Sequence, residues 1–213
     1  MKFDGRRARP IPNQEVVDFI STKLDSKYLY SDTIVDKYLH TYYEWIKSSK
    51  LNNLIGIEDF NSLSFCHGTS QAFDFFYAEN KDRRMRCYQG DFIYHTVCWR
   101  NNYPGWKYIE DDDIKENDAV IISLPFSDYG FRHPDMEAIL DQCDELGVPV
   151  FIDSAYYSIC RELDFNLDRE CIKSISFSLS KAFYGAERLR IGLRCKRDFN
   201  DDPLDVITSM GMV

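Results

Sequence analysis

The sequence predicts an α/β domain of three layers, in which a mainly parallel sheet lies between two layers of helices. Residues 119–124 and 148–153 are short, continuous apolar runs, which are typical of strands buried on both faces. Between them, a segment opened by Pro134 and ended by Gly147 places its apolar residues on one side of a helix. Two strands joined by a crossover helix run parallel. Further strands are expected over 85–88 and 191–195.

Composition argues against several classes of function. The 213 residues include 26 basic and 35 acidic side chains, a net charge of −9, which disfavours binding to nucleic acid or to an anionic membrane. No segment approaches the roughly 20 apolar residues of a membrane span, and the N-terminus has no apolar signal core. The seven cysteines are odd in number and form no CxxC pair. We therefore expect reduced thiols, a cytoplasmic protein and no metal site.

The N-terminal region divides into an arm and the start of the main domain. Residues 1–13 are polar and basic and contain two prolines, so we expect an arm, followed by a helix over 14–24 that Asn13 caps. We assign residues 1–27 to this arm and helix, and 28–213 to the larger domain. A helix over 33–49 carries an aromatic stripe, which predicts packing in the core or against a partner subunit. Residues 52–62 are expected to be a connection.

A glycine turn precedes the next predicted helix. A short strand over 63–68 ends at Gly68, and the helix begins at Thr69 and Ser70. Because the first N–H groups of a helix have no partner within it, and because its positive dipole end points outward, this pattern predicts an anion site. Capping of the helix by Thr69 or Ser70 explains the same residues without a ligand.

Two later strands end in side chains that can carry chemistry. Asp153 follows a buried strand, at the end where ligands bind in open α/β sheets, although an aspartate there can also cap the next turn. Residues 174–177 alternate polar and apolar like a half-buried strand, which leads to Lys181. A lysine shielded from water can attack a carbonyl carbon. Otherwise, Lys181 is a surface residue after an edge strand.

Groups suited to a phosphate lie around that lysine. Hydroxyls stand one and three residues before Lys181, and an Arg-x-Gly sequence follows nine residues after it. Hydroxyls and a guanidinium together bind phosphate well. A lysine, a phosphate anchor and a strand end suggest a cofactor that forms a Schiff base and has a phosphate tail.

These motifs follow one another in a recognisable order: Gly68-Thr69-Ser70-Gln71-Ala72, an aromatic near 92, the loop 124–130, Asp153-Ser154-Ala155-Tyr156-Tyr157, and Ser178-Leu179-Ser180-Lys181 with Arg190-Ile191-Gly192. Their order and spacing resemble the large domain of class I/II aminotransferases, which are pyridoxal-phosphate enzymes of fold type I, similar to aspartate aminotransferase. The resemblance covers residues 28–195. It implies pyridoxal 5'-phosphate (PLP) as the cofactor.

The resemblance also implies catalytic roles. Lys181 matches the lysine that forms the Schiff base and later moves a proton at the substrate α-carbon. Asp153 matches the acid that pairs with the pyridine nitrogen, where a carboxylate keeps the ring protonated and electron-accepting. Tyr156 matches the tyrosine that hydrogen-bonds the phenolic oxygen of the cofactor.

The phosphate-binding positions of the family match four residues, namely Thr69, Ser70, Ser178 and Arg190. The spacing from lysine to arginine is one residue longer than the family pattern, so Arg188 is an alternative to Arg190. Phe92 corresponds to the aromatic residue that stacks on the ring, with Tyr94 as its alternative. An early tyrosine, Tyr28 or Tyr30, corresponds to the one that reaches the phosphate of the partner subunit in family dimers.

Two further departures from the family pattern concern a cofactor contact and the substrate-binding domain. Ser127 replaces the asparagine that contacts the phenolic oxygen, and a serine reaches less far. Only 23 residues follow Arg190, so we expect the C-terminal small domain to be missing or incomplete. In the family that domain supplies the arginine that binds the substrate carboxylate. Arg132, or Arg6 or Arg7 of the arm, is the candidate to replace it.

The expected function is transfer of an amino group from an amino acid or related amine to a keto acceptor, by a homodimer. A lyase, decarboxylase or racemase is the alternative within PLP chemistry, because substrate orientation decides which bond breaks. The other alternative is a truncated or split protein. Such a protein binds the cofactor or dimerises, and does not catalyse a reaction alone.

Overall fold

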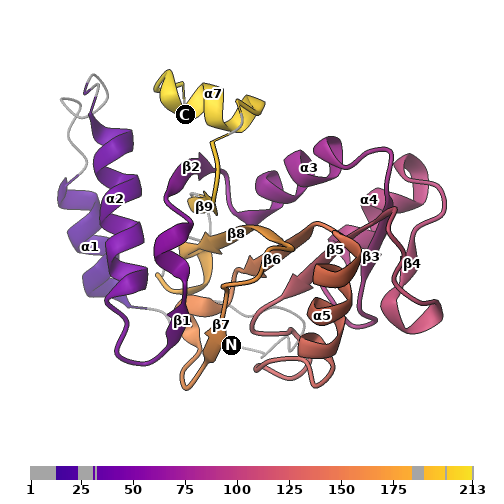
Figure 1. Ribbon diagram of the computed structural model, residues 1–213. Helices are drawn as coiled ribbons and strands as arrows, with labels where there is room; N and C mark the ends of the chain where they lie inside the picture. Colours follow the sequence, from indigo (N-terminus) through magenta and orange to yellow (C-terminus); the bar gives the residue numbers. More distant parts are fainter. Residues whose placement is uncertain (1–12, 24–30, 32, 184–189, 200, 213) are drawn as a thin grey trace.

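The computed structural model describes residues 13–23, 31, 33–183, 190–199 and 201–212. Its centre is a seven-stranded sheet in the order β2-β9-β8-β6-β5-β3-β4, with helices on both faces (Figure 1). The strands are β2 (Ser62–Cys66), β3 (Arg84–Cys87), β4 (Lys107–Tyr108), β5 (Asp118–Ser123), β6 (Val150–Ser154), β8 (Ile172–Ser178) and β9 (Gly192–Lys196). The predicted three-layer α/β architecture is confirmed.

The sheet is mainly parallel. β4, β3, β5, β6 and β8 pair in parallel, and β9 runs antiparallel to both β8 and β2. The predicted parallel unit of β5 and β6 is present, and its register places Ser123 opposite Asp153. The crossover helix between them, α5, ends at Gly147, which has the left-handed conformation (φ of 64°) that favours glycine.

Alternate side chains of the central strands enter two separate cores. Val120 and Ile122 of β5 pack in the core shared with α2 (Ile34–Lys47) and α5 (Met136–Leu146). Ala119 and Ile121 pack in the core on the other face. The helices of that face are α3 (Thr69–Glu79), α4 (Tyr94–Asn102) and α7 (Pro203–Ser209). The sheet is therefore covered on both sides, as its continuous apolar runs predict.

The strand that leads to Lys181 differs from its prediction. The alternation over 174–177 predicts one face in water, yet in β8 every residue except Lys173 is buried. The reason is its position, because β8 lies between β6 and β9 and helices cover both faces. The small Ser174 and Ser176 are buried there as polar residues. The prediction of a half-buried strand is therefore wrong.

The N-terminal helices agree with their predicted ranges. α1 (Gln14–Lys23) follows Asn13, whose side-chain oxygen accepts hydrogen bonds from the N–H groups of Glu15 (3.0 Å) and Val16 (3.3 Å). Most of the aromatic stripe of α2 is core of this same chain; the buried residues are Leu39, Tyr42, Tyr43 and Ile46. Trp45 stays 43% exposed and contacts the ring of Phe183 at 6.2 Å.

The predicted connection over 52–62 contains a short strand, so that prediction is wrong. β1 (Asn53–Ile55) pairs in parallel with β7 (Asp164–Asn166) in a separate two-stranded sheet. Neither strand has a local pattern long enough to predict it. Four single turns of 3-10 helix complete the described elements: η2 (Ile57–Asp59), η3 (Ile109–Asp111), η4 (Tyr157–Ile159) and η5 (Leu179–Lys181).

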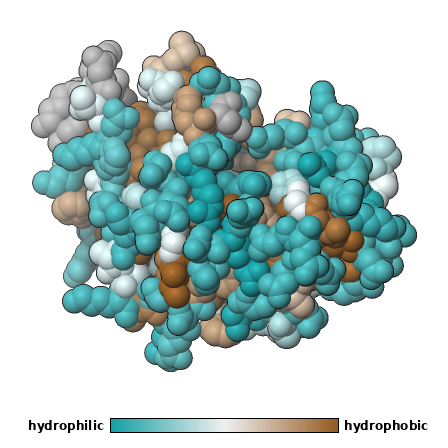
Figure 2. Space-filling model, viewed as in Figure 1, coloured by the Kyte–Doolittle hydropathy of each residue, from teal (hydrophilic) through white to brown (hydrophobic). Residues whose placement is uncertain are grey.

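The surface is mostly polar on the face shown in Figure 2, where apolar side chains form separate patches and no continuous band. Within the described ranges, no helix is long and apolar enough to cross a membrane.

Candidate active site

The candidate site lies where the parallel strands end. The register brings Ser123 of β5 beside Asp153 of β6, and Asp153 beside Ser176 of β8, two residues before the end of that strand at Ser178. The chain then turns through η5, which carries Lys181. Carboxyl ends of parallel strands meet at one edge of a sheet, so the predicted acid and the predicted lysine arrive together.

Asp153 is a buried carboxylate with an unusual environment. Only 5% of its surface is exposed. Burial, and then the nearby charge of Asp91, raises the pKa of Asp153 to about 7. The N–H of Ala155, which donates to Asp153 Oδ1 at 3.0 Å, the Thr69 hydroxyl and the charge of Lys181 act in the opposite direction. Asp153 therefore caps the next turn and also remains able to exchange a proton near neutral pH.

Lys181 and Tyr156 face each other beside that acid. Lys181 Nζ lies 5.3 Å from the centroid of the Tyr156 ring, a contact of the cation–π type. Burial, and then the charge of Asp153, raises the pKa of Tyr156. The amine, the phenol and the carboxylate that the sequence selects thus come together from η5 and the end of β6.

A second group of residues forms an anion site at the start of α3. Arg190 Nη2 donates to Ser70 Oγ at 3.2 Å. A side chain at Gly68 would begin 3.1 Å from Arg190 Nη2, and the φ of 72° at Gly68 also requires glycine. The N-cap residue of α3 is Gly68, which has no side chain that could cap the helix, and Gln71 Oε1 accepts from the N–H of His67 outside the helix at 2.8 Å. The first N–H groups of α3 and the guanidinium are therefore available to an anion, and the simple capping interpretation lacks its hydrogen bond.

Two of the hydroxyls predicted to bind phosphate have other contacts. The Thr69 hydroxyl lies against Asp153 and lowers its pKa, so a phosphate contact of Thr69 would use its backbone N–H. Ser178 Oγ accepts a hydrogen bond from the N–H of Ser180 at 3.1 Å and so shapes the turn before Lys181. Ser180 Oγ is buried and has no hydrogen-bond partner among the described residues. Such an orphaned hydroxyl can be satisfied by a ligand.

The predicted ring-stacking residue lies at the start of α4. Phe92 is 42% exposed, and its ring stacks on Tyr94 at 6.0 Å. Tyr94 is the alternative stacking residue. Its hydroxyl donates to Asp74 of α3 at 3.0 Å, and this hydrogen bond holds Tyr94 against α3. Ser127 is exposed in the loop after β5. The structure thus places Phe92 and Ser127 on two loops that follow the strand ends, and their contacts with a cofactor stay predictions.

Other predicted residues are engaged elsewhere or lie outside the described chain. Arg132 Nη1 forms an ion pair with Glu137 at 2.7 Å, so binding a substrate carboxylate would require exchange of this partner. Tyr28, Tyr30, Arg6, Arg7 and Arg188 lie outside the described residues. Within the described ranges, no three His, Cys, Asp or Glu side chains form a group that could hold a metal ion.

Sequence reasoning missed Asp91 and its partner Ser123. The Asp91 side chain is completely buried in the turn before α4, and the hydroxyl of Ser123 donates to it. The sequence shows only an aspartate after a glycine, which usually predicts an exposed turn. Nothing in the local pattern indicates that β5 brings this aspartate beside Asp153.

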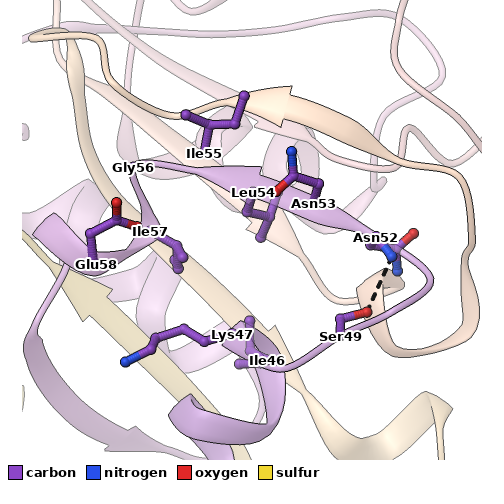
Figure 3. A pocket seen from close by; sticks show the side chains of 10 residues that line it. All are labelled: Ile46, Lys47, Ser49, Asn52, Asn53, Leu54, Ile55, Gly56, Ile57 and Glu58. Atoms are coloured by element: carbon purple, nitrogen blue, oxygen red, sulfur yellow. Dashed lines mark hydrogen bonds between the residues drawn. The ribbon is translucent and has the colours of Figure 1, made fainter.

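A hollow of about 520 Å³ lies elsewhere, between the end of α2 and β1 (Figure 3). Its lining comes from the continuous stretch 46–58, and none of the predicted site residues line it. Lys47 and Glu58 are the charged residues that line it, and nothing around it resembles a nucleophile with a base. We therefore place the candidate site at the strand ends and not in this hollow.

The comparison with known families agrees with the geometry. The profile of the family "Aminotransferase class I and II" matches residues 86–210, which is more than half of the chain. The chain therefore belongs to this family. No curated protein matches the sequence.

Solved structures share the fold at low identity. They include the PLP-bound C-S lyase of Staphylococcus hominis (TM-score 0.61, 16% identity, covering 95% of this chain and 61% of that one). Histidinol-phosphate aminotransferases of Clostridium acetobutylicum (TM-score 0.62, 12% identity, 96% and 65%) and of Sinorhizobium meliloti with bound PLP (TM-score 0.59, 11% identity, 89% and 55%) are also similar. The chain thus spans 55% to 65% of the length of these structures.

PLP is the cofactor that this family membership supports, and the described residues fit it. The uncapped start of α3 with Arg190 suits a phosphate, the buried Asp153 suits a pyridine nitrogen, and Lys181 is an amine beside both Asp153 and Tyr156. The carboxylate and the amine are the two chemical features by which a PLP site differs from a simple anion site.

Proposed function

We propose that this chain is a PLP-dependent aminotransferase that acts on an amino acid or a related amine, with Lys181 as the residue that bonds the cofactor. The observation that carries the proposal is the position of Lys181 Nζ, 5.3 Å from the Tyr156 ring and close enough to Asp153 for its charge to affect that carboxyl group. A surface lysine after an edge strand would have neither neighbour, and β8 is a central strand.

The residues divide the work between holding the cofactor and moving protons. When bound, PLP supplies an aldehyde carbon that an amine attacks and a pyridine ring that withdraws electrons from the reacting carbon. Arg190, Ser70 and the first N–H groups of α3 hold the phosphate end. Asp153 would hold a proton at the ring nitrogen, and Tyr156 would hydrogen-bond the phenolic oxygen. Lys181 Nζ would take a proton from the substrate α-carbon and deliver it to the former aldehyde carbon of the cofactor, which is the proton movement that aminotransfer requires.

A homodimer in the cytoplasm is part of this proposal. Phe183, two residues after Lys181, contacts the ring of Trp45, and both rings are exposed. An exposed aromatic pair so near the site supports a subunit contact there. All seven cysteines are free thiols, and burial raises the pKa of Cys66 to about 12, as expected for unreactive buried thiols in a reducing compartment.

A C–S lyase with this fold makes bond cleavage the second candidate reaction. The described site residues are those expected to bind the cofactor, and none of them is assigned to the substrate. Their geometry therefore favours neither reaction. Product analysis separates the two. A keto acid formed together with pyridoxamine phosphate indicates aminotransfer, whereas a released thiol or carbon dioxide indicates a lyase or decarboxylase.

The first experiment is an absorbance spectrum of the purified chain with added PLP, beside Lys181→Ala. We expect a visible band in the wild type and complete loss of that band in the variant, because the amine that bonds the cofactor is gone. Lys173→Ala is the matched control, since Lys173 is the exposed residue of the same strand. It should keep the band.

A band that survives in Lys181→Ala would overturn the assignment of the lysine. Absence of any band in the folded wild type would contradict cofactor binding by this chain alone. A band that forms only after a second polypeptide is added would instead support the split form of the enzyme.

A further inference from the structure

A second carboxylate lies behind Asp153. Asp91 stands in the turn between β3 and α4, and its side chain is 0% exposed. The backbone N–H of Ser123 donates to Asp91 Oδ2 at 3.1 Å, and the Ser123 hydroxyl donates to Oδ1. The N–H of Phe92 donates to Oδ1 at 2.6 Å. These three hydrogen bonds fix the carboxylate in one orientation.

This carboxylate is a neighbour of Asp153 across the sheet. Ser123, which holds Asp91, is the register partner of Asp153 between β5 and β6. The charge of Asp91 acts on Asp153 strongly enough to be, after burial, the second cause of its raised pKa. Burial raises the pKa of Asp91 as well, and the hydrogen bonds from Ser123 and Phe92 oppose it. Asp91 contacts Ser123 and Asp153 is the register partner of Ser123, so each carboxylate lies within range of the charge of the other.

On the side of α4, the described titratable neighbour of Asp91 is His95, which burial keeps uncharged. His95 Nε2 lies 3.9 Å from Asp91 Oδ1 and has no hydrogen-bond partner among the described residues. The Tyr77 hydroxyl lies 2.6 Å from His95 Nδ1. Burial lowers the pKa of His95 to about 3, so its ring is neutral at physiological pH. Among the described residues, titratable groups that interact with one member of this pair include His133, Cys87, Tyr88, Cys66, Tyr156 and Lys181.

We propose that Asp91, held in the turn before α4 by hydrogen bonds from Ser123 and Phe92, is a positioning residue of the active site that places a second buried carboxylate next to Asp153. Its consequence for the reaction rests on the proposed function. A proton held firmly where Asp153 meets the ring nitrogen keeps the cofactor electron-accepting. The turn before α4 then has two roles, because it carries both Asp91, which acts on the proton, and Phe92, the predicted stacking residue.

The test measures the pKa of Asp153 directly, in the full chain without cofactor, by carboxyl carbon NMR. Asp153→Asn assigns the signal. In Asp91→Asn we expect the pKa of Asp153 to fall by about one unit, the coupling typical of carboxylates that share a site. Asp91→Glu keeps the charge and alters the packing. In this variant the pKa of Asp153 should differ from the wild-type value by less than about half a unit. Asp74→Asn, which alters an exposed carboxylate of α3, should leave the pKa of Asp153 unchanged.

Ser123→Ala provides an independent variant in case Asp91→Asn does not fold. It removes a hydrogen bond that favours ionised Asp91, so Asp91 holds its proton more firmly and the pKa of Asp153 should again fall. An unchanged Asp153 pKa in either folded variant, or an equal fall in Asp91→Asn and Asp91→Glu, overturns the proposal. Because this readout needs no cofactor, it separates failure of the Asp91 proposal from failure of PLP binding, which the spectrum of Lys181→Ala tests.

Discussion

The two ends of β5 treat buried carboxylates in opposite ways. At the amino end, Asp118 is 1% exposed and bonds to Arg84 Nε and Arg86 Nη1, each at 2.6 Å. Burial by itself would raise the pKa of Asp118, but Arg84, the N–H of Lys115 and Arg86 together hold it below its usual value. At the carboxyl end, Asp91 and Asp153 lie together, and the pKa of each is raised.

The carboxylate at the amino end of β5 has a structural role, whereas the carboxylates at the carboxyl end are suited to proton transfer. Arg86 is completely buried and donates to the backbone carbonyls of Lys107 (3.2 Å) and Tyr108 (3.1 Å), so the balanced pair also attaches the edge strand β4. A buried charge with its partner stabilises one arrangement, whereas a buried charge left in excess keeps a proton available. The position of a carboxylate in the sheet does not by itself reveal whether it is structural or exchanges a proton. The charges that the fold brings to each end of the strand decide it.

The largest effect that tests this comparison is on stability at the amino end. Arg86→Met removes one of the two cations that bond to Asp118 and leaves the buried carboxylate with Arg84 and the N–H of Lys115. We expect a loss of about 3–5 kcal/mol in the free energy of unfolding, the usual result of breaking a buried pair. Urea denaturation measures it, with the exposed Arg100→Met of α4 as the control. A loss below about 1 kcal/mol would show that the amino end is no more structural than the surface.

The next effect concerns the dependence of stability on pH at the carboxyl end. Asp153 ionises near pH 7 when folded, against a pKa of about 3.9 for an unfolded aspartate. The folded protein therefore binds this proton more tightly, and the associated stability, full below about pH 4, declines as the pH rises toward 7. Asp118, with its lowered pKa, contributes with the opposite sign.

Asp153→Asn should remove that decline. Relative to the wild type without cofactor, the variant should gain stability between about pH 4 and pH 7, by at most about 1.4 kcal/mol for each unit of the pKa difference. Urea midpoints measured across this range provide the check. Parallel curves for the two proteins would mean that Asp153 is not a raised-pKa group, and the contrast between the two ends of β5 would disappear.

The smallest effect is on cofactor affinity at the start of α3. Removing the guanidinium in Arg190→Ala deletes a charged hydrogen bond worth about 1.5–3 kcal/mol, so we expect PLP to bind about 10- to 100-fold more weakly. Ser70→Ala should weaken binding by about five-fold, because it removes only a neutral hydroxyl. Titration of the visible band measures both, and the exposed Arg161→Ala is the control. An equal loss in Arg161→Ala would place the effect in net charge and not in this site.

Local sequence was sufficient for the framework and for the family. The apolar runs of β5 and β6, the helix between them and the glycine turn at Gly68 are patterns within about ten residues, where side-chain period and backbone preference act directly. The motif order also placed Asp153 and Lys181 at strand ends, and the fold brings them together with Tyr156.

Only the tertiary structure decided which neighbours these elements would have. β1 and β7 are too short for a periodic signal and exist through their pairing across 111 residues, as between Asn53 and Asp164. β8 is buried on both faces because β6 and β9 flank it, although its own sequence alternates. The pKa of Asp153 likewise depends on Asp91, which is far away in the chain. Burial and charge are sums over everything nearby in space, and no local pattern of residues contains that sum.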